Sequence, residues 1–212
     1  PVTRLVAPGP IEVVHAIAPN ARLVVINAIP TLNGNSSSSV MLSVSKMFAY
    51  ADQHYPGAVW SLSIGWGCEQ MYTGADLRPV QAALEPAEAH GTTAYDARGD
   101  TAGLGCKGNS DYSTPPNHSD VGVDAVGTLP AMTSVGGTLL STDAHGNWSA
   151  EEAWDFSAIS QGSSGGVSTL VARPSWQHAV GMASLRGAGQ RLIPDVSADA
   201  DPYSGMTLVM NG

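Results

Sequence analysis

The stretch Gly91-Thr-Thr-Ala-Tyr-Asp-Ala-Arg-Gly-Asp100, with the turn Thr101-Ala-Gly103 behind it, joins a short run of β character to a glycine and an acid. This pattern is typical of a strand that delivers a carboxylate into a loop. In an open parallel sheet, the loops at the carboxyl ends of the strands form the ligand crevice. Asp100 is therefore the first candidate functional residue.

Two further segments resemble strand-end loops. Ser63-Ile-Gly-Trp-Gly-Cys-Glu69 follows an apolar run, and Ser134-Val-Gly-Gly-Thr138 closes another. We expect one strand-end face of the sheet to gather these two segments and the Asp100 loop.

The hydrophobic pattern outside these segments alternates between helical spacing and short β-branched runs. Residues 22–27 form a continuous β-branched run, which predicts a strand buried on both faces. The order of strand, helix and strand predicts parallel crossovers, and hence one α/β domain over residues 1–212 with a mainly parallel sheet flanked by helices. Helices are expected at 11–18, 40–54, 75–90 and 173–183, and strands at 22–27, 58–64, 92–97, 132–135 and 206–210. A long surface loop is expected at 103–121, a hairpin or a pair of irregular loops at 143–160, and a Gly/Ser turn at 161–168. Residues 187–212 are expected to form a loop that contains the strand at 206–210.

Charge and composition exclude several classes of protein. The chain has 18 acidic residues against 9 Lys and Arg, and the basic residues are scattered, which argues against nucleic acid and against an anionic membrane surface as partners. No apolar run approaches the roughly 20 residues that span a bilayer. The start at Pro1, without a signal-peptide pattern, indicates a mature or trimmed piece.

The two cysteines, Cys68 and Cys106, lie in loops after two neighbouring predicted strands, where a disulfide would tie these loops together. A disulfide and the low lysine content favour a secreted or extracellular protein. The alternative is a pair of free buried thiols.

Three motifs have simpler interpretations. Residues 103–108 match the GxGxxG spacing, but no helix opens after them to receive a phosphate. Residues 162–166 match GxSxG around Ser164, but no histidine follows His178 to complete a triad, so a flexible glycine turn is favoured over a hydrolase elbow. The histidines lack metal-ligand spacing, and the acidic group Asp195, Asp199 and Asp201 is interpreted as turn capping, so no metal site is expected.

Several stretches, in order along nearly the whole chain, resemble the sedolisin family of serine-carboxyl peptidases, which have a subtilisin-like fold and mostly work in acid. The most specific is Ile193-Pro-Asp-Val-Ser-Ala-Asp-Ala-Asp-Pro202. The others are residues 15–21, 63–69, 91–103, 134–138, 152–154, 162–168 and 174–177.

The resemblance implies a serine nucleophile, a glutamate general base oriented by an aspartate, and a further aspartate in the oxyanion hole. That last residue corresponds to Asp100, which must be protonated to donate a hydrogen bond to the oxyanion. The segments that line the substrate cleft correspond to Ser63, Gly65, Trp66 and Gly67 in one loop, and to Ser164, Gly165 and Gly166 in another. Peptides or proteins are then the expected substrates.

The chain departs from the family at the nucleophile and the base. The family's Asp of the Glu/Asp pair falls at Pro10, the position one turn earlier is Val6, and Glu12 is a fallback base. The nucleophile's Gly-Thr-Ser segment and the calcium loop would lie beyond Gly212, so no cofactor is expected in this chain.

Three explanations remain open. The chain is a fragment of an active peptidase that needs a missing C-terminal segment or second chain, or a non-catalytic relative that binds peptides or partners. The third is an unrelated α/β-hydrolase-type esterase that uses Ser164.

Overall fold

The structure is a computed structural model that describes residues 8–27, 36–107, 114–159, 161–178, 187 and 189–205. The helices are α1 (Pro8–Ile17), α2 (Ser37–His54) and α3 (Gly74–Ala89), and the short 3-10 helices are η2 (Glu69–Met71), η3 (His118–Asp120), η4 (Val126–Thr128) and η5 (Ser157–Ile159). The strands are β1 (Val59–Leu62), β2 (Thr93–Ala97), β3 (Met132–Thr142), β4 (Trp148–Ala153), β5 (Asp155–Phe156), β6 (Gln161–Gly162), β7 (Gly166–Ala172), β8 (Gln190–Ile193) and β9 (Val196–Asp199).

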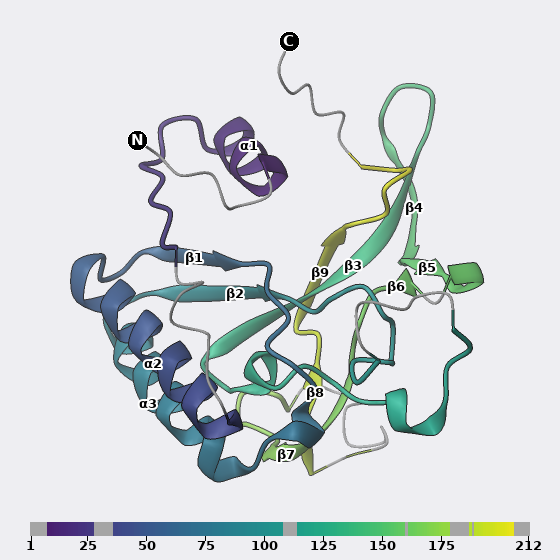
Figure 1. Ribbon diagram of the computed structural model, residues 1–212. Coiled ribbons are helices and arrows are strands. Elements are labelled where there is room, and N and C mark those ends of the chain that lie inside the picture. The colour runs from purple at the N-terminus through teal and green to yellow at the C-terminus, as the bar shows by residue number, and fades with distance from the viewer. Residues whose placement is uncertain are drawn as a thin grey trace.

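The main sheet has five strands and is mostly parallel. Its order is β1-β2-β3-β4, with β9 also paired to β3. The pairs β1–β2, β2–β3 and β3–β9 are parallel, and β3–β4 is an antiparallel hairpin. The expected crossover from 58–64 through 75–90 to 92–97 is confirmed as β1, α3 and β2 (Figure 1).

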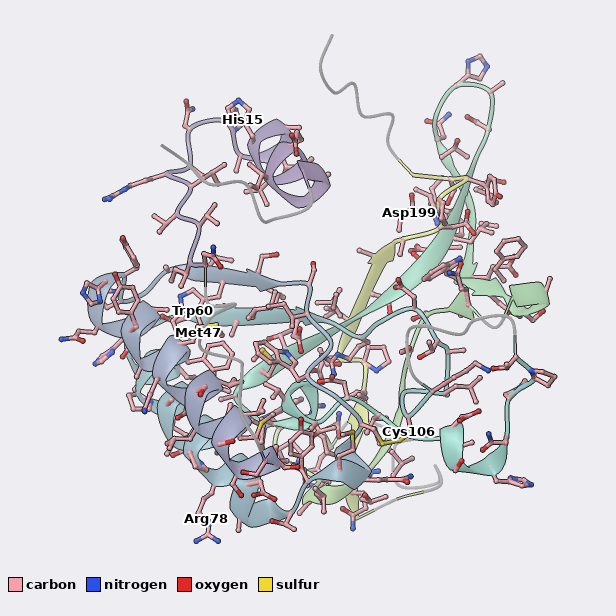
Figure 2. The ribbon with its side chains drawn as sticks, in the orientation of Figure 1. His15, Met47, Trp60, Arg78, Cys106 and Asp199 are labelled. Atoms are coloured by element: carbon pink, nitrogen blue, oxygen red, sulfur yellow. A yellow bond between two sulfur atoms is a disulfide. The ribbon has the colours of Figure 1, made fainter. Side chains whose placement is uncertain are left out.

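Helices α2 and α3 lie side by side and cover one face of the sheet (Figure 1). Each begins at a capping box, with Ser36 before α2 and Thr73 before α3, so the first free amides of both helices are bonded. Phe48 of α2 stacks on Trp60 of β1 with ring centroids 5.6 Å apart. Met47 and Trp60 lie together at the margin of this core (Figure 2). Its buried members are Met41, Val44, Phe48, Trp66, Leu77, Val80, Leu84, Ala94, Ala125, Val126, Leu129 and Met132.

The expected strand at residues 22–27 does not form. These residues have no regular secondary structure, and Leu23, Val24 and Val25 are each between 42% and 51% exposed. The neighbouring edge strand β1 pairs only with β2 among the described residues, and its Val59 is 73% exposed. A β-branched run needs a partner strand to satisfy its backbone groups, and no described strand pairs with residues 22–27.

Four other expectations differ from the structure or lie outside it. Residues 173–178 form a turn rather than the start of a helix, and residues 179–183 lie outside the described part. The segment 134–138 is the middle of β3 rather than a loop, because β2 and β9 pair along it. The strands β8 and β9 fall where a loop was expected. The expected strand at 206–210 lies outside the described residues.

In the described part of the chain, no helix combines the length and the apolar character that crossing a bilayer requires.

Candidate functional site

The Asp100 loop lies against the Gly162–Gly166 turn. The amide of Gly162 donates to the carbonyl of Asp100 at 2.9 Å, and the amide of Ala102 donates back to the carbonyl of Gly162 at 3.0 Å. The amide of Ser164 donates to the carbonyl of Gly99 at 3.2 Å. Two segments about 60 residues apart in the sequence therefore form one backbone ladder beyond the carboxyl end of β2.

The backbone of this loop is held in a conformation that few residues adopt. Gly99 has a φ of +86°, and Ala102 is left-handed with a φ of +52°, which is uncommon for a residue with a side chain. Such strained residues persist only where the surroundings fix them, and the ladder to Gly162 and Ser164 does so here.

The carboxyl of Asp100 is exposed at the end of this ladder, while its backbone is held by Gly162. Partial desolvation by the surrounding loop raises the pKa of Asp100 above its ordinary value. A raised pKa favours the protonated acid, which is the form that donates a hydrogen bond.

The Ser164 side chain faces the same loop and is only 6% exposed. Its hydroxyl accepts a hydrogen bond from the amide of Thr101 at 3.1 Å and lies 3.5 Å from the Thr101 hydroxyl. Among the described residues, no histidine or carboxylate bonds to Ser164. A serine nucleophile needs such a base, so the geometry does not favour the esterase alternative.

A cavity of about 730 Å³ opens beside Ser164. Its walls include Ser163 and Gly165 from the glycine turn, Thr138 from β3, and Trp148 and Glu152 from β4. The Thr138 hydroxyl is bonded to the carboxylate of Glu151, and the Trp148 side chain is 67% exposed at the rim. The cavity has the size and the mixed polar and aromatic lining of a site for a small ligand or a peptide side chain.

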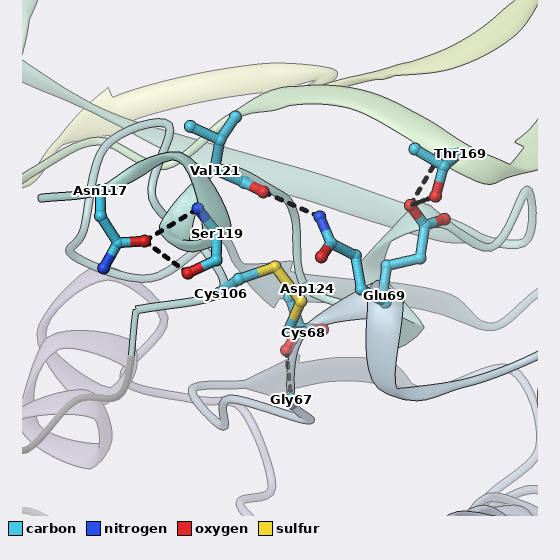
Figure 3. The surroundings of a disulfide bond; sticks show 10 residues. Gly67, Cys68, Glu69, Cys106, Asn117, Ser119, Val121, Asp124 and Thr169 are labelled. Carbon is cyan, nitrogen blue, oxygen red and sulfur yellow. Dashed lines mark hydrogen bonds between the residues drawn. A yellow bond between two sulfur atoms is a disulfide. The ribbon is translucent and has the colours of Figure 1, made fainter.

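The segment 63–69 follows β1 and is fixed at its far end. The predicted disulfide between Cys68 and Cys106 is confirmed and joins this segment to the loop after β2 (Figure 3). Glu69 is buried and accepts hydrogen bonds from the amides of Thr169 at 2.7 Å and Leu170 at 3.2 Å, which anchors the segment to β7.

The members of this loop that were predicted to line the cleft divide into two groups. Ser63 and Gly65 are exposed, and Gly67 is half-buried. Trp66 is only 5% exposed and packs on Phe48 with ring centroids 5.9 Å apart, so its indole belongs to the core rather than to an open cleft wall. The sequence did not reveal this because a tryptophan between two glycines is equally typical of an exposed loop.

A buried charge cluster of Asp96, Arg98 and Asp124 lies beneath this loop and was missed from the sequence. Asp96 and Arg98 are 0% and 4% exposed and form an ion pair through Oδ2 and Nη2. Asp124 places its Oδ1 4.0 Å from Nη1 of Arg98. The sequence contained part of this information. Residues 96 and 98 are two positions apart, so they share one face of a strand, and two charged residues on a buried face require partners.

Burial raises the pKa of Asp96 to about 7 in spite of the opposing effect of Arg98. Burial also raises the pKa of Asp124, again against the effect of Arg98 and of the amides that bond to it. These buried carboxyl groups therefore hold protons more tightly than exposed ones.

Of the acidic group near the end of the described chain, Asp201 caps a turn as expected from the sequence, whereas Asp195 forms an ion pair. Asp195 forms two bonds of 2.5 Å to the guanidinium of Arg191 and accepts the amide of Ser134 at 2.8 Å. Asp199 bonds to the hydroxyl of Ser204, and Asp201 caps a turn. Across the described ranges, no three His, Cys, Asp or Glu side chains are placed to hold a metal ion.

Glu12 lies on α1, and its buried Oε2 has no hydrogen-bond partner among the residues that the structure describes. Figure 1 draws α1 on the β1 side of the sheet, away from β3 and β4. No described hydrogen bond or ion pair joins Glu12 to Asp100 or Ser164, so the structure does not bring the fallback base together with the candidate acid Asp100.

Comparisons with known proteins find relatives along most of the chain, although no family model matches it. The chain is 30% identical to kumamolisin from Bacillus sp. (strain MN-32) over 206 residues, which cover 95% of this chain and 34% of that protein. It is 29% identical to sedolisin from Pseudomonas sp. (strain 101) over 182 residues, or 84% of this chain and 30% of that protein. The chain thus spans about a third of the length of these curated relatives.

A solved structure has the same fold. It is Pseudomonas sedolisin, a serine-carboxyl proteinase, complexed with two molecules of pseudo-iodotyrostatin. The TM-score is 0.64 at 25% identity, and the match covers 81% of this chain and 45% of that chain.

Proposed function

Because the chain belongs to the sedolisin family and has its subtilisin-like α/β fold, we propose that it forms the peptide-binding and oxyanion-stabilising part of an acid-favoured serine-carboxyl endopeptidase. The substrate would be a peptide or protein. The Cys68–Cys106 disulfide supports a location outside the reducing cytosol, which agrees with secretion.

One observation carries the proposal. The backbone ladder between the Asp100 loop and the Gly162–Ser164 turn joins the residue proposed as the oxyanion acid to the second segment proposed to line the substrate cleft. These two segments match the family separately in the sequence, and the cavity of about 730 Å³ opens beside their junction. A bound peptide would lie over this junction, with one side chain in the cavity.

Asp100 would stabilise the negative charge that develops on the carbonyl oxygen of the substrate. A carboxylic acid does this only while it is protonated, and desolvation shifts its pKa in the required direction. Activity that depends on this proton falls as the pH rises, in agreement with an enzyme that works in acid.

We further propose that residues 1–212 by themselves bind peptides without cleaving them. Ser164 lacks a base among the described residues, and Glu12 is not connected to the Asp100 loop. The family's Gly-Thr-Ser segment does not occur in residues 1–212.

The experiment is hydrolysis of a quenched fluorescent peptide library across pH 3 to 8, together with binding of pseudo-iodotyrostatin measured by calorimetry. We expect residues 1–212 to bind this compound below neutral pH with no turnover. In a form of the protein that does hydrolyse peptides, Asp100→Ala lowers kcat by about 100-fold or more, because one oxyanion donor is lost. Asp143→Ala, in the exposed turn of the β3–β4 hairpin, is the matched control and leaves kcat unchanged.

Two results would contradict the proposal. Turnover by residues 1–212 that Ser164→Ala abolishes and Asp100→Ala leaves intact would favour the esterase alternative. A hydrolytically active form in which Asp100→Ala has no effect would remove Asp100 from the oxyanion site.

A further inference from the structure

The centre of the loop at residues 63–69 is held by one carboxylate, that of Asp124. Oδ2 of Asp124 accepts hydrogen bonds from the amides of Trp66 at 2.6 Å and Gly67 at 3.1 Å, and Figure 3 shows the bond to Gly67. The other oxygen accepts the amide of Val126 at 3.2 Å. Both amides at the centre of the loop therefore depend on Asp124 for their orientation.

Neighbouring contacts complete this support. The carbonyl of Trp66 accepts the hydroxyl of Tyr72 at 2.7 Å, and the carbonyl of Gly67 accepts the amide of Ala125 at 2.9 Å. Gly67 has a φ of +101°, which only glycine adopts readily, so the loop conformation is one that its surroundings impose. Among the groups that bond to the backbone of Trp66 and Gly67, Asp124 is the carboxylate.

The guanidinium of Arg98 compensates the charge of Asp124 and also forms an ion pair with Asp96. Two largely buried carboxyl groups thus face one guanidinium, and full ionisation would leave a net negative charge in the interior. In the described part of the chain, Oδ1 of Asp96 and Nη1 of Arg98 have no hydrogen-bond partner. The other titratable group that acts on Asp124 is the phenol of Tyr72, which is neutral throughout the acid range.

Asp96 lies within β2 between its neighbours β1 and β3, whereas Asp124 lies before η4 and pairs with Cys68 in an isolated β-bridge. If both carboxyl groups were ionised, their repulsion and the competition for Arg98 would act on the Asp124 side chain, whose carboxylate bonds to the loop. The amides of Trp66 and Gly67 would then lose their acceptor.

We propose that Asp124 is a positioning residue for the peptide-binding loop, and that Asp96 and Arg98 set its charge so that the loop keeps its binding shape only while the cluster holds one proton. Burial raises the pKa of both Asp96 and Asp124, so the cluster holds this proton in acid. The loop is then ordered at the low pH at which the family works and loosens above neutrality. This inference rests on the proposed function only in calling the loop peptide-binding.

The test is amide hydrogen exchange of the full chain between pH 4 and 8.5, expressed as protection factors so that the intrinsic effect of pH is removed. We expect protection of the Trp66 and Gly67 amides to be constant up to about pH 6 and to fall about tenfold or more above pH 7, as the bonds to Asp124 are lost. Amides of α3 report global unfolding, so loop amides that lose protection while those of α3 remain the better protected show a local opening of the loop.

Two variants separate the roles of the carboxyl groups. Asp96→Asn mimics the protonated acid, so protection of the loop persists to pH 8.5. Asp124→Asn turns a charged acceptor into an amide that cannot accept two bonds equally well, so protection is low at every pH. Asp76→Asn, at the start of α3, is the control and leaves the loop unchanged.

The wild-type pH series is sufficient to overturn the proposal: loop protection that does not change with pH would refute the role of the proton. Unchanged protection in Asp124→Asn would refute the positioning role. Binding of pseudo-iodotyrostatin is measured on the same samples. Loop protection that changes with pH but no binding at any pH would refute the proposed function while leaving the positioning role of Asp124 intact.

Discussion

Replacement of the buried Asp96 by asparagine should remove a pH dependence of stability. The carboxyl has a pKa of about 7 in the folded chain against 3.8 as its ordinary value. Because the folded state binds this proton more tightly than the unfolded state, protonation stabilises the fold. The contribution is fully present below pH 3.8 and is lost as the pH rises through 7.

The size of the effect follows from the pKa difference. About three units correspond to about 4 kcal/mol of unfolding free energy, lost at up to about 1.4 kcal/mol per pH unit between pH 4 and pH 7. Asp96→Asn cannot ionise and lacks this loss. The difference in unfolding free energy, wild type minus variant, should therefore fall by about 4 kcal/mol between pH 4 and pH 7.5.

Urea unfolding followed by fluorescence at pH 4, 5, 6, 7 and 7.5, with unchanged m-values in both proteins, measures this difference. The remaining carboxyl groups are common to both proteins and cancel to first order. A wild-type minus variant difference that is flat across this range would show that Asp96 titrates normally. The reasoning about the buried charge cluster would then be wrong.

Two further predictions concern the same region. Gly127→Ala would place a Cβ 1.6 Å from Nη1 of Arg98, and because that guanidinium is buried and paired, unfolding free energy should fall by about 3 kcal/mol in urea titrations. Gly74→Ala, where a Cβ meets nothing within 4 Å, is the control, and equal effects of the two substitutions would contradict the close contact. Replacing both Cys68 and Cys106 by serine opens a loop of 38 residues and should cost about 4 kcal/mol by the chain-entropy estimate. Thermal unfolding of the wild type with and without reductant checks this, and an identical wild-type Tm under both conditions would refute it.

Local sequence patterns determined the elements whose signals lie close together in the sequence. The helices expected at 11–18, 40–54 and 75–90 are present as α1, α2 and α3, and the strands expected at 58–64 and 92–97 as β1 and β2. Apolar periodicity and capping residues lie within a few positions of the elements they define, so they can be read without knowing the fold. The Cys68–Cys106 pairing also followed from the order of the elements.

Features that depend on partners far along the chain were decided only by the tertiary structure. The β-branched run at 22–27 has strand character but pairs with no strand in the described part of the chain, and the segment 134–138 became a strand because β2 and β9 lie on either side of it. The buried charge cluster forms because the fold places Asp124 beside Arg98, 26 positions earlier in the sequence. The junction of the candidate site forms because the fold places Ser164 beside Thr101. Sequence spacing fixes which face of an element a side chain occupies, whereas pairing and burial depend on which elements the packed core brings together.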